Sequence, residues 1–78
     1  MTTTLADLKK GEKARLVRFA SVSGFSRRLM EMGMLPGCIL EVKAIAPFGD
    51  PISVMIRGGR ISLRKKEARE IIVEKVEK

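Results

Sequence analysis

The 78-residue sequence contains no histidine, no tryptophan, no tyrosine and only one cysteine. Without histidine it lacks the commonest general base and the commonest metal ligand of proteins. The lone Cys38 can form neither an internal disulfide nor a four-ligand zinc site, and neither glycine pattern that cradles nucleotide phosphates is present. We therefore expect no enzyme, no cofactor and no metal site in this chain.

Long apolar runs are also missing. No stretch approaches the roughly 20 apolar residues that a membrane-spanning helix needs, and residues 1–4 do not resemble the start of a signal peptide. A chain of this length has room for one hydrophobic core. We expect residues 1–78 to form a single cytoplasmic domain.

Acidic side chains are outnumbered, with sixteen Lys and Arg against nine Asp and Glu, for a net charge of +7. Such a charge favours acidic partners, whether nucleic acid, an anionic membrane surface or an acidic protein face. Platforms for single-stranded nucleic acid need flat aromatic side chains, and here only three phenylalanines are available. A small basic barrel that grips nucleic acid is the alternative interpretation, with phosphate contacts from Arg57, Arg60, Arg64, Lys65 and Lys66.

One amphipathic helix is predicted between Phe25 and Gly33. Phe25, Leu29 and Met32 recur at i, i+4 and i+7, so they share one face, which we expect to pack against the rest of the protein. Gly33 suits the left-handed residue that commonly follows a helix. The opposite face is polar and holds Arg27, Arg28 and Glu31.

Alternating apolar residues predict about five short strands. The first spans residues 13–20, with Ala14, Leu16 and Arg18 on one side. The second places Leu40, Val42 and Ala44 on its inner face. The last three centre on residues 52–57, 61–63 and 71–76.

The connections between these strands are short. Thr4 and Asp7 form a capping-box pattern that opens a helical turn at Leu5, and residues 65–68 suit another turn. Gly58-Gly59 provides a two-residue hairpin turn, and residues 47–51 form a proline-bracketed loop. We expect an SH3-like antiparallel barrel with a short inserted helix. A βαβ sandwich is the alternative, but it needs two long helices.

Three ordered segments carry a resemblance to a known family. They are Arg28-Leu29-Met30-Glu31-Met32-Gly33-Met34-Leu35-Pro36-Gly37, the loop Ala46-Pro47-Phe48-Gly49-Asp50-Pro51, and Leu63-Arg64 before Glu67-Ala68 and the strand at 71–73. Together with the opening Leu5-Ala6-Asp7-Leu8-Lys9-Lys10-Gly11, they resemble the FeoA family, ferrous iron transport protein A. The resemblance implies an SH3-like accessory protein that works beside FeoB, a membrane ferrous iron transporter with a cytoplasmic GTP-binding domain.

Under this resemblance, the helix, the turn after it and the proline-bracketed loop form a docking face for the GTPase part of the transporter. Flexible, polarizable methionines suit an adaptable apolar patch, although they also suit packing of the helix onto the barrel. Phe48 suits either an exposed anchor or a barrel plug. Contact with a membrane would come only through the transporter, and exposed edge strands could pair into a homo-oligomer. The predicted partner-binding residues are Arg27, Arg28, Met30, Met34, Leu35 and Phe48.

Overall fold

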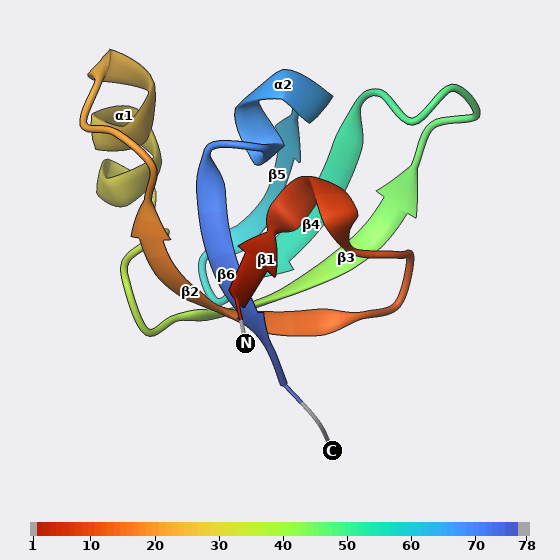
Figure 1. Ribbon diagram of the computed structural model, residues 1–78, viewed down its shortest axis with the longest axis horizontal. Coiled ribbons are helices and arrows are strands. Elements are labelled where there is room, and N and C mark those ends of the chain that lie inside the picture. The colour runs from red at the N-terminus through yellow and green to blue at the C-terminus, as the bar shows by residue number, and fades with distance from the viewer. Residues whose placement is uncertain (1, 77–78) are drawn as a thin grey trace.

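The computed structural model describes residues 2–76 and contains one antiparallel sheet of six strands. Its strands are β1 (Thr2–Thr4), β2 (Lys13–Phe19), β3 (Ile39–Ile45), β4 (Ile52–Ile56), β5 (Gly59–Leu63) and β6 (Ile71–Lys75). They lie in the order β1-β6-β2-β3-β4-β5 (Figure 1). The helical segments are the 3₁₀ turn η1 (Leu5–Asp7), α1 (Gly24–Glu31) and α2 (Lys65–Ala68).

The predicted fold class is confirmed, since the protein is mainly β with one short helix inserted between β2 and β3. The predicted number of strands is too low because β1 was not recognised. It consists of three threonines without apolar alternation, and it exists through its antiparallel pairing with β6, where Thr2 lies opposite Glu74 and Thr4 opposite Ile72.

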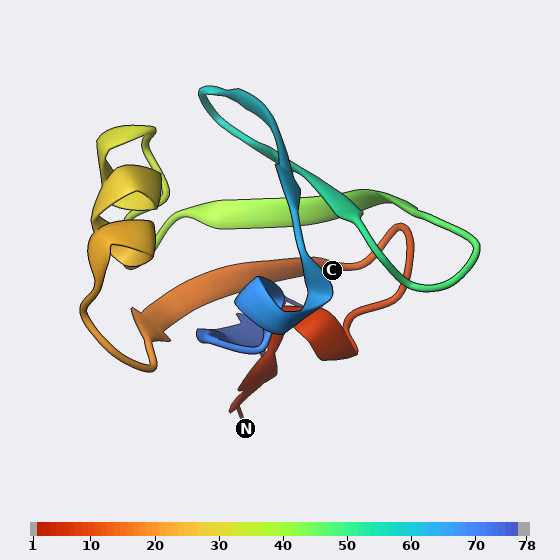
Figure 2. The ribbon, with the colours of Figure 1, turned by 90° about the horizontal axis from the view of Figure 1, so that it is seen from above.

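The sheet curls but stays open, in contrast to the expected closure by strand pairing. β1 and β5 are its two edges, and no pairing joins them among residues 2–76. The gap between the edges is bridged by η1, which packs against α2 and β6 (Figure 2). Closure of this small core is therefore completed by short helical turns.

Two β-bulges bend the central strands and change which residues face inward. The pairing of β2 with β6 shifts between Leu16 and Arg18, and that of β3 with β4 shifts between Val42 and Ala44. Each extra residue reverses the alternation beyond it. Ala44 is consequently exposed, which corrects its predicted inward placement, and Arg18 is exposed and does not share the buried side of Ala14 and Leu16. The side chains that pack against the core beyond the bulges are Phe19 and Ile45.

The core is aliphatic and draws on every strand except β1, on α1 and on both helical turns. Each large aliphatic side chain in it contributes about 1.5–3 kcal/mol through burial. Its fully buried members include Leu16, Leu40, Val42, Val54, Ile71 and Val73.

Helix α1 is capped by reciprocal serine hydrogen bonds and packs on the core through Phe25 and Leu29 of the predicted face, together with Ser26. The Ser26 backbone N–H donates to Ser23 Oγ at 3.3 Å, and the Ser23 N–H donates to Ser26 Oγ at 2.9 Å. Ser26 and Leu29 are buried, Phe25 is half-buried, and Met32 is 47% exposed. The expectation that Met32 packs on the barrel is thus wrong. Gly33, with φ +103°, ends the helix as predicted.

The β4–β5 hairpin turns one residue earlier than expected. Ile56 pairs with Gly59, so the two turn residues are Arg57 and Gly58. Gly59 is the residue with positive φ, at +134°. The hairpin tip meets the end of α1, because a Cβ at Gly58 would lie 3.4 Å from the Met32 carbonyl oxygen.

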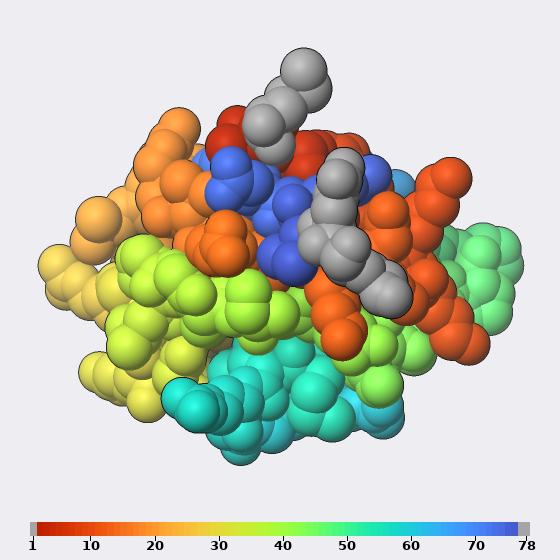
Figure 3. All heavy atoms as spheres, turned by 90° about the horizontal axis from the view of Figure 1, so that it is seen from below, coloured from red at the N-terminus to blue at the C-terminus, as the bar shows by residue number. Residues whose placement is uncertain are grey.

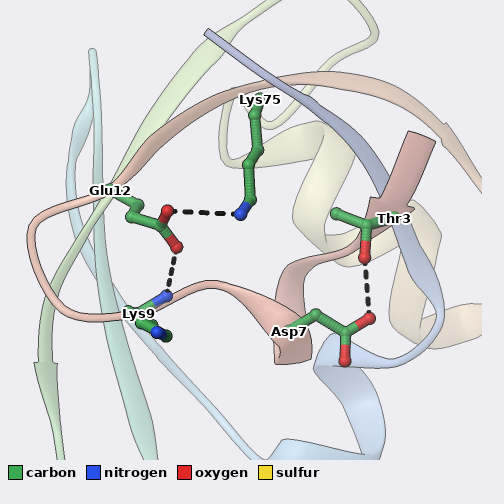
Figure 4. A network of polar contacts seen from close by, with 5 residues as sticks. All are labelled: Thr3, Asp7, Lys9, Glu12 and Lys75. Carbon is green, nitrogen blue, oxygen red and sulfur yellow. Dashed lines mark hydrogen bonds and ion pairs between the residues drawn. The ribbon is translucent and has the colours of Figure 1, made fainter. Parts of the chain in front are cut away.

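A polar network holds the N-terminal segment against the sheet (Figure 4). The Asp7 carboxylate accepts hydrogen bonds from the Thr3 hydroxyl at 2.8 Å and the Thr4 hydroxyl at 3.0 Å. The helical turn predicted at Leu5 is confirmed, since Leu5–Asp7 form the 3₁₀ turn η1. The Glu12 carboxylate accepts from the Lys9 N–H at 2.6 Å and pairs with Lys75 Nζ on β6 at 3.3 Å.

Candidate functional site

The predicted docking residues differ widely in exposure. Arg27 and Arg28 are exposed on α1, and Leu35, after the helix, is 50% exposed. Met30 is half-buried and offers only part of its side chain. These four residues lie on one continuous segment of the chain, formed by α1 and the turn after it.

Met34 does not belong to that face. Its side chain is fully buried within the hydrophobic core, although it lies in the turn between α1 and β3. Its N–H donates to the Leu29 carbonyl oxygen at 3.0 Å, which folds the chain back under the helix. The prediction that Met34 contacts a partner is corrected, because none of its side chain is exposed.

Phe48 is separated from the helix. It is 96% exposed, so it is not a barrel plug. The β3–β4 loop that carries it projects from the end of the sheet opposite α1, as both ribbon views show (Figures 1 and 2). The predicted docking face therefore divides into two surfaces at opposite ends of the molecule.

The surface at the α1 end is formed by Arg28, Met32, Leu35, Ile39 and Arg57, and we call it the α1-turn surface. Met32, Leu35 and Ile39 are 47%, 50% and 43% exposed. Arg57 at the hairpin tip borders the same hollow as Ile39. The space-filling view shows the end of α1, the following turn and the β4–β5 tip meeting on one face (Figure 3). The result is an apolar patch flanked by two guanidinium groups.

Beside this surface, a groove of about 340 Å³ runs between α1 and β5. Its helix wall consists of Phe25, Arg28, Leu29 and Met32. Its strand wall consists of Ile61, Ser62 and Leu63, with Glu67 from α2. The groove thus combines an apolar floor with the outer edge of a terminal strand.

Cys38 lies at the start of β3 beside Gly37, Ile39 and Arg57. It is half-buried, and burial raises the pKa of its thiol, so the neutral thiol form is favoured at neutral pH. Within residues 2–76 no three His, Cys, Asp or Glu side chains gather closely enough to hold a metal ion.

The basic residues singled out around the hairpin do not form one patch. Arg57 and Arg60 are exposed at the hairpin end of β5, and Lys66 follows the other end of the strand. Four residue steps of about 3.3 Å along the extended segment separate Arg60 from Arg64 by on the order of 13 Å, and Lys66 lies beyond Arg64 in α2. The same region also holds the acidic side chains of Asp50 and Glu67.

Sequence reasoning missed Met32 and Ile39 as surface residues. Ile39 was open to recognition, because it precedes the inward Leu40 by one position and an alternating strand must turn it outward. The exposure of Met32 could not be recognised from the sequence, because its spacing from Leu29 is also the spacing of a buried residue on the apolar face of a helix. Across residues 2–76, no helix has the length and apolar character needed to cross a membrane.

Comparison with known proteins gives close matches in sequence and in structure. A curated Fe(2+) transport protein A/Fe(2+) transporter FeoB fusion protein of Porphyromonas gingivalis is 36% identical over 70 residues. These cover 90% of this chain and 8% of that protein, so the chain spans a small fraction of the relative's length.

Solved structures agree over nearly the whole chain. The FeoA protein from Chlorobium tepidum superposes with a TM-score of 0.90 at 36% identity, covering 96% of this chain and 71% of that one. The zinc-complexed FeoA of Stenotrophomonas maltophilia, described as a prokaryotic SH3 domain protein, gives a TM-score of 0.81 at 28% identity, covering 92% and 89%. The family model described as FeoA domain matches residues 3–75, and the chain belongs to the FeoA family.

Proposed function

We propose that this protein is a cytoplasmic accessory of ferrous iron uptake that docks on the GTPase part of an FeoB-like transporter, to regulate or assemble it. The observation that carries the proposal is the fusion protein of Porphyromonas gingivalis, in which a homologous segment is joined to the transporter. Joining two proteins in one chain keeps them at a high effective concentration, which is useful when they act together.

The α1-turn surface is the proposed contact. Its three large apolar side chains are exposed on neighbouring segments, whereas Phe48 stands alone at the other end. Flexible methionine beside aliphatic side chains suits an adaptable protein interface. Arg28 and Arg57 at its border would meet acidic groups of the partner and increase the rate of encounter.

The test is an NMR titration of the ¹⁵N-labelled protein with the purified cytoplasmic part of the transporter from the same organism. We expect shifts concentrated in α1, the turn at residues 33–38 and the β4–β5 tip. Shifts confined to the Phe48 loop would keep the function and move the contact. No shifts at saturating concentration would contradict docking on this part of the transporter.

A further inference from the structure

Strand β5 presents an unpaired backbone edge. It is last in the strand order, and its inner side pairs with β4 without a bulge. The two-residue turn makes Ile56 and Gly59 a hydrogen-bonded pair, so the alternation leaves the N–H and C=O groups of Arg60 and Ser62 on the outer side. These are the groups that an added strand would use.

Strand β5 lacks two of the devices that commonly block strand addition, a proline and a β-bulge. Natural edges are commonly blocked by proline, by a bulge or by a covering segment. The residues of β5 include no proline, and the register to β4 is regular. Helix α1 lies alongside as the opposite wall of the groove and leaves the groove open to solvent.

The groove beside this edge provides an apolar site for an anchoring side chain. Phe25, Leu29 and Met32 face Ile61 and Leu63 across it. A second hollow, lined by Asp50, Pro51 and Arg64, shares Ser62, Leu63 and Glu67 with the first. The two hollows therefore adjoin at the Leu63 end of β5, and we call them together the channel.

The hairpin end of this channel is basic, whereas its other end mixes the carboxylates of Asp50 and Glu67 with the exposed guanidinium of Arg64. The end near the hairpin carries Arg60 on β5 and Arg28 on α1, both exposed. At the other end, the Asp50 carboxylate accepts a hydrogen bond from the Lys65 N–H, and Glu67 accepts one from the Arg64 N–H. An occupant is favoured when its carboxylates lie at the hairpin end.

We infer that β5 and α1 accept an extended acidic segment of a partner protein, which adds as a seventh strand beside β5. An apolar side chain of the segment fills the groove between Leu29 and Ile61, and its carboxylates face Arg28 and Arg60. This inference rests on the proposed function insofar as the partner is the transporter. The recognition chemistry itself can be tested separately.

The first experiment uses two synthetic peptides of ten residues. Both alternate valine and threonine around a central isoleucine, and one carries three terminal glutamates where the other carries three lysines. With the ¹⁵N-labelled protein, the glutamate peptide should slow hydrogen exchange at the Arg60 and Ser62 amides. The affinity of the lysine peptide should be at least about tenfold lower than that of the glutamate peptide, a difference of ~1.4 kcal/mol. Equal binding of both, or no protection of these two amides, overturns the inference.

Charge reversal provides the matched control. Arg60→Glu should exchange the preference, so that the lysine peptide binds better, whereas Arg18→Glu on the exposed side of β2 makes the same charge change away from the channel and should leave the preference intact. Wild-type-like thermal melts establish that both variants fold. Protection of Arg60 and Ser62 that grows with protein concentration, without peptide, would assign the edge to a second copy and overturn the inference.

The transporter experiment separates the two proposals. Binding of its cytoplasmic part with protection at Arg60 and Ser62 supports both. Binding without that protection keeps the proposed function and removes strand addition. If the glutamate peptide binds as expected and the transporter does not, the acidic-strand site stands and the proposed function falls.

Discussion

The carboxylate of Asp50, in the β3–β4 loop, accepts a 3.0 Å hydrogen bond from the backbone N–H of Lys65, the first residue of α2. The first N–H groups of a helix have no partner within the helix. Asp50 therefore caps α2 from a loop fifteen residues away in sequence, and it ties two connections of the sheet together.

Removing this cap should destabilise the fold modestly. Asp50→Ala leaves the Lys65 N–H to water and should cost about 1 kcal/mol of unfolding free energy. Asp50→Asn keeps an acceptor oxygen and should lose less. Urea denaturation at neutral pH measures both. Equal stability of the alanine variant and the wild type would mean that the bond contributes nothing in solution.

Stability should depend on Asp7 in the acidic range. The Thr3 hydroxyl, followed by the Thr4 hydroxyl and amide, holds the pKa of Asp7 below its ordinary value of 3.8. A carboxyl with a lowered folded-state pKa stabilises the fold above its ordinary value, and this contribution is lost as the pH falls through the lowered value. Asp7→Asn should therefore melt below wild type at pH 7, and the two Tm values should converge below about pH 3.8.

A matched control for this experiment is Glu31→Gln. Glu31 is exposed on α1, and no hydrogen bond or ion pair to its side chain occurs within residues 2–76. The Tm of Glu31→Gln should differ little from that of the wild type at both pH 7 and pH 2.5. A Tm difference between Asp7→Asn and the wild type that stays constant from pH 7 to pH 2.5 would contradict the stabilising role of the Asp7 carboxylate.

Met34 and Leu35 are adjacent in sequence, yet their truncation should have different consequences. Met34→Ala empties core volume and should cost about 2–5 kcal/mol. Leu35→Ala removes a half-exposed side chain and should cost under about 1 kcal/mol. Urea denaturation of the two variants compares them directly. Similar losses for both would show that the turn packs differently in solution.

The two glycines that bound α1 should respond oppositely to alanine. Gly33, with φ +103°, adopts a conformation that L-residues resist, and the nearest atom to an added Cβ is Ile56 Cδ1 at an ordinary 3.9 Å. Gly33→Ala should therefore cost about 1 kcal/mol through the backbone alone. Gly24→Ala, at the helix start with open space around it, should stabilise by about 0.4–1 kcal/mol. Thermal melts would reveal the opposite signs, and a shift of the same sign in both would refute this account.

Docking should be lost by polar substitutions on the α1-turn surface. The double variant Met32→Ser, Leu35→Ser removes two exposed apolar side chains and should weaken binding to the transporter's cytoplasmic part at least tenfold, or ~1.4 kcal/mol. Phe48→Ser removes a more exposed side chain at the other end of the molecule and should bind as wild type. Calorimetric titration distinguishes them, and the reverse order would move the interface to the Phe48 loop.

The sequence was sufficient to predict those elements whose signals are local. Alternation in β4 and β5, the capping pattern at Thr4 and Asp7, and Gly33 after the helix each arise from interactions over a few residues. The bulges in β2 and β3 were not predictable in this way. Nothing at Val17 or Lys43 marks an extra residue, because a bulge is set by the registers of two neighbouring strands.

The docking residues depended on more distant relations. Which end of the molecule carries Phe48 follows from the direction of β3, and the burial of Met34 follows from its packing in a core assembled from residues distant in sequence. Helix α1 also contains a buried residue that the apolar pattern does not mark, because Ser26 is polar and only 1% exposed. Its hydroxyl is satisfied by donating to the Ser23 carbonyl oxygen at 3.1 Å, so a polar side chain fits at that position.

The antiparallel pairing of β1 with β6 places the first and last strands of the fold side by side, since Thr2 lies opposite Glu74. A polypeptide that enters through β1 and leaves through β6 therefore does so at neighbouring points of the sheet. Inserting such a unit into a loop of a host protein would require little stretching of the host chain, and the loop-closure entropy would be small. Because its first and last strands are adjacent, this fold can be inserted into a longer protein without any change in the packing of its core.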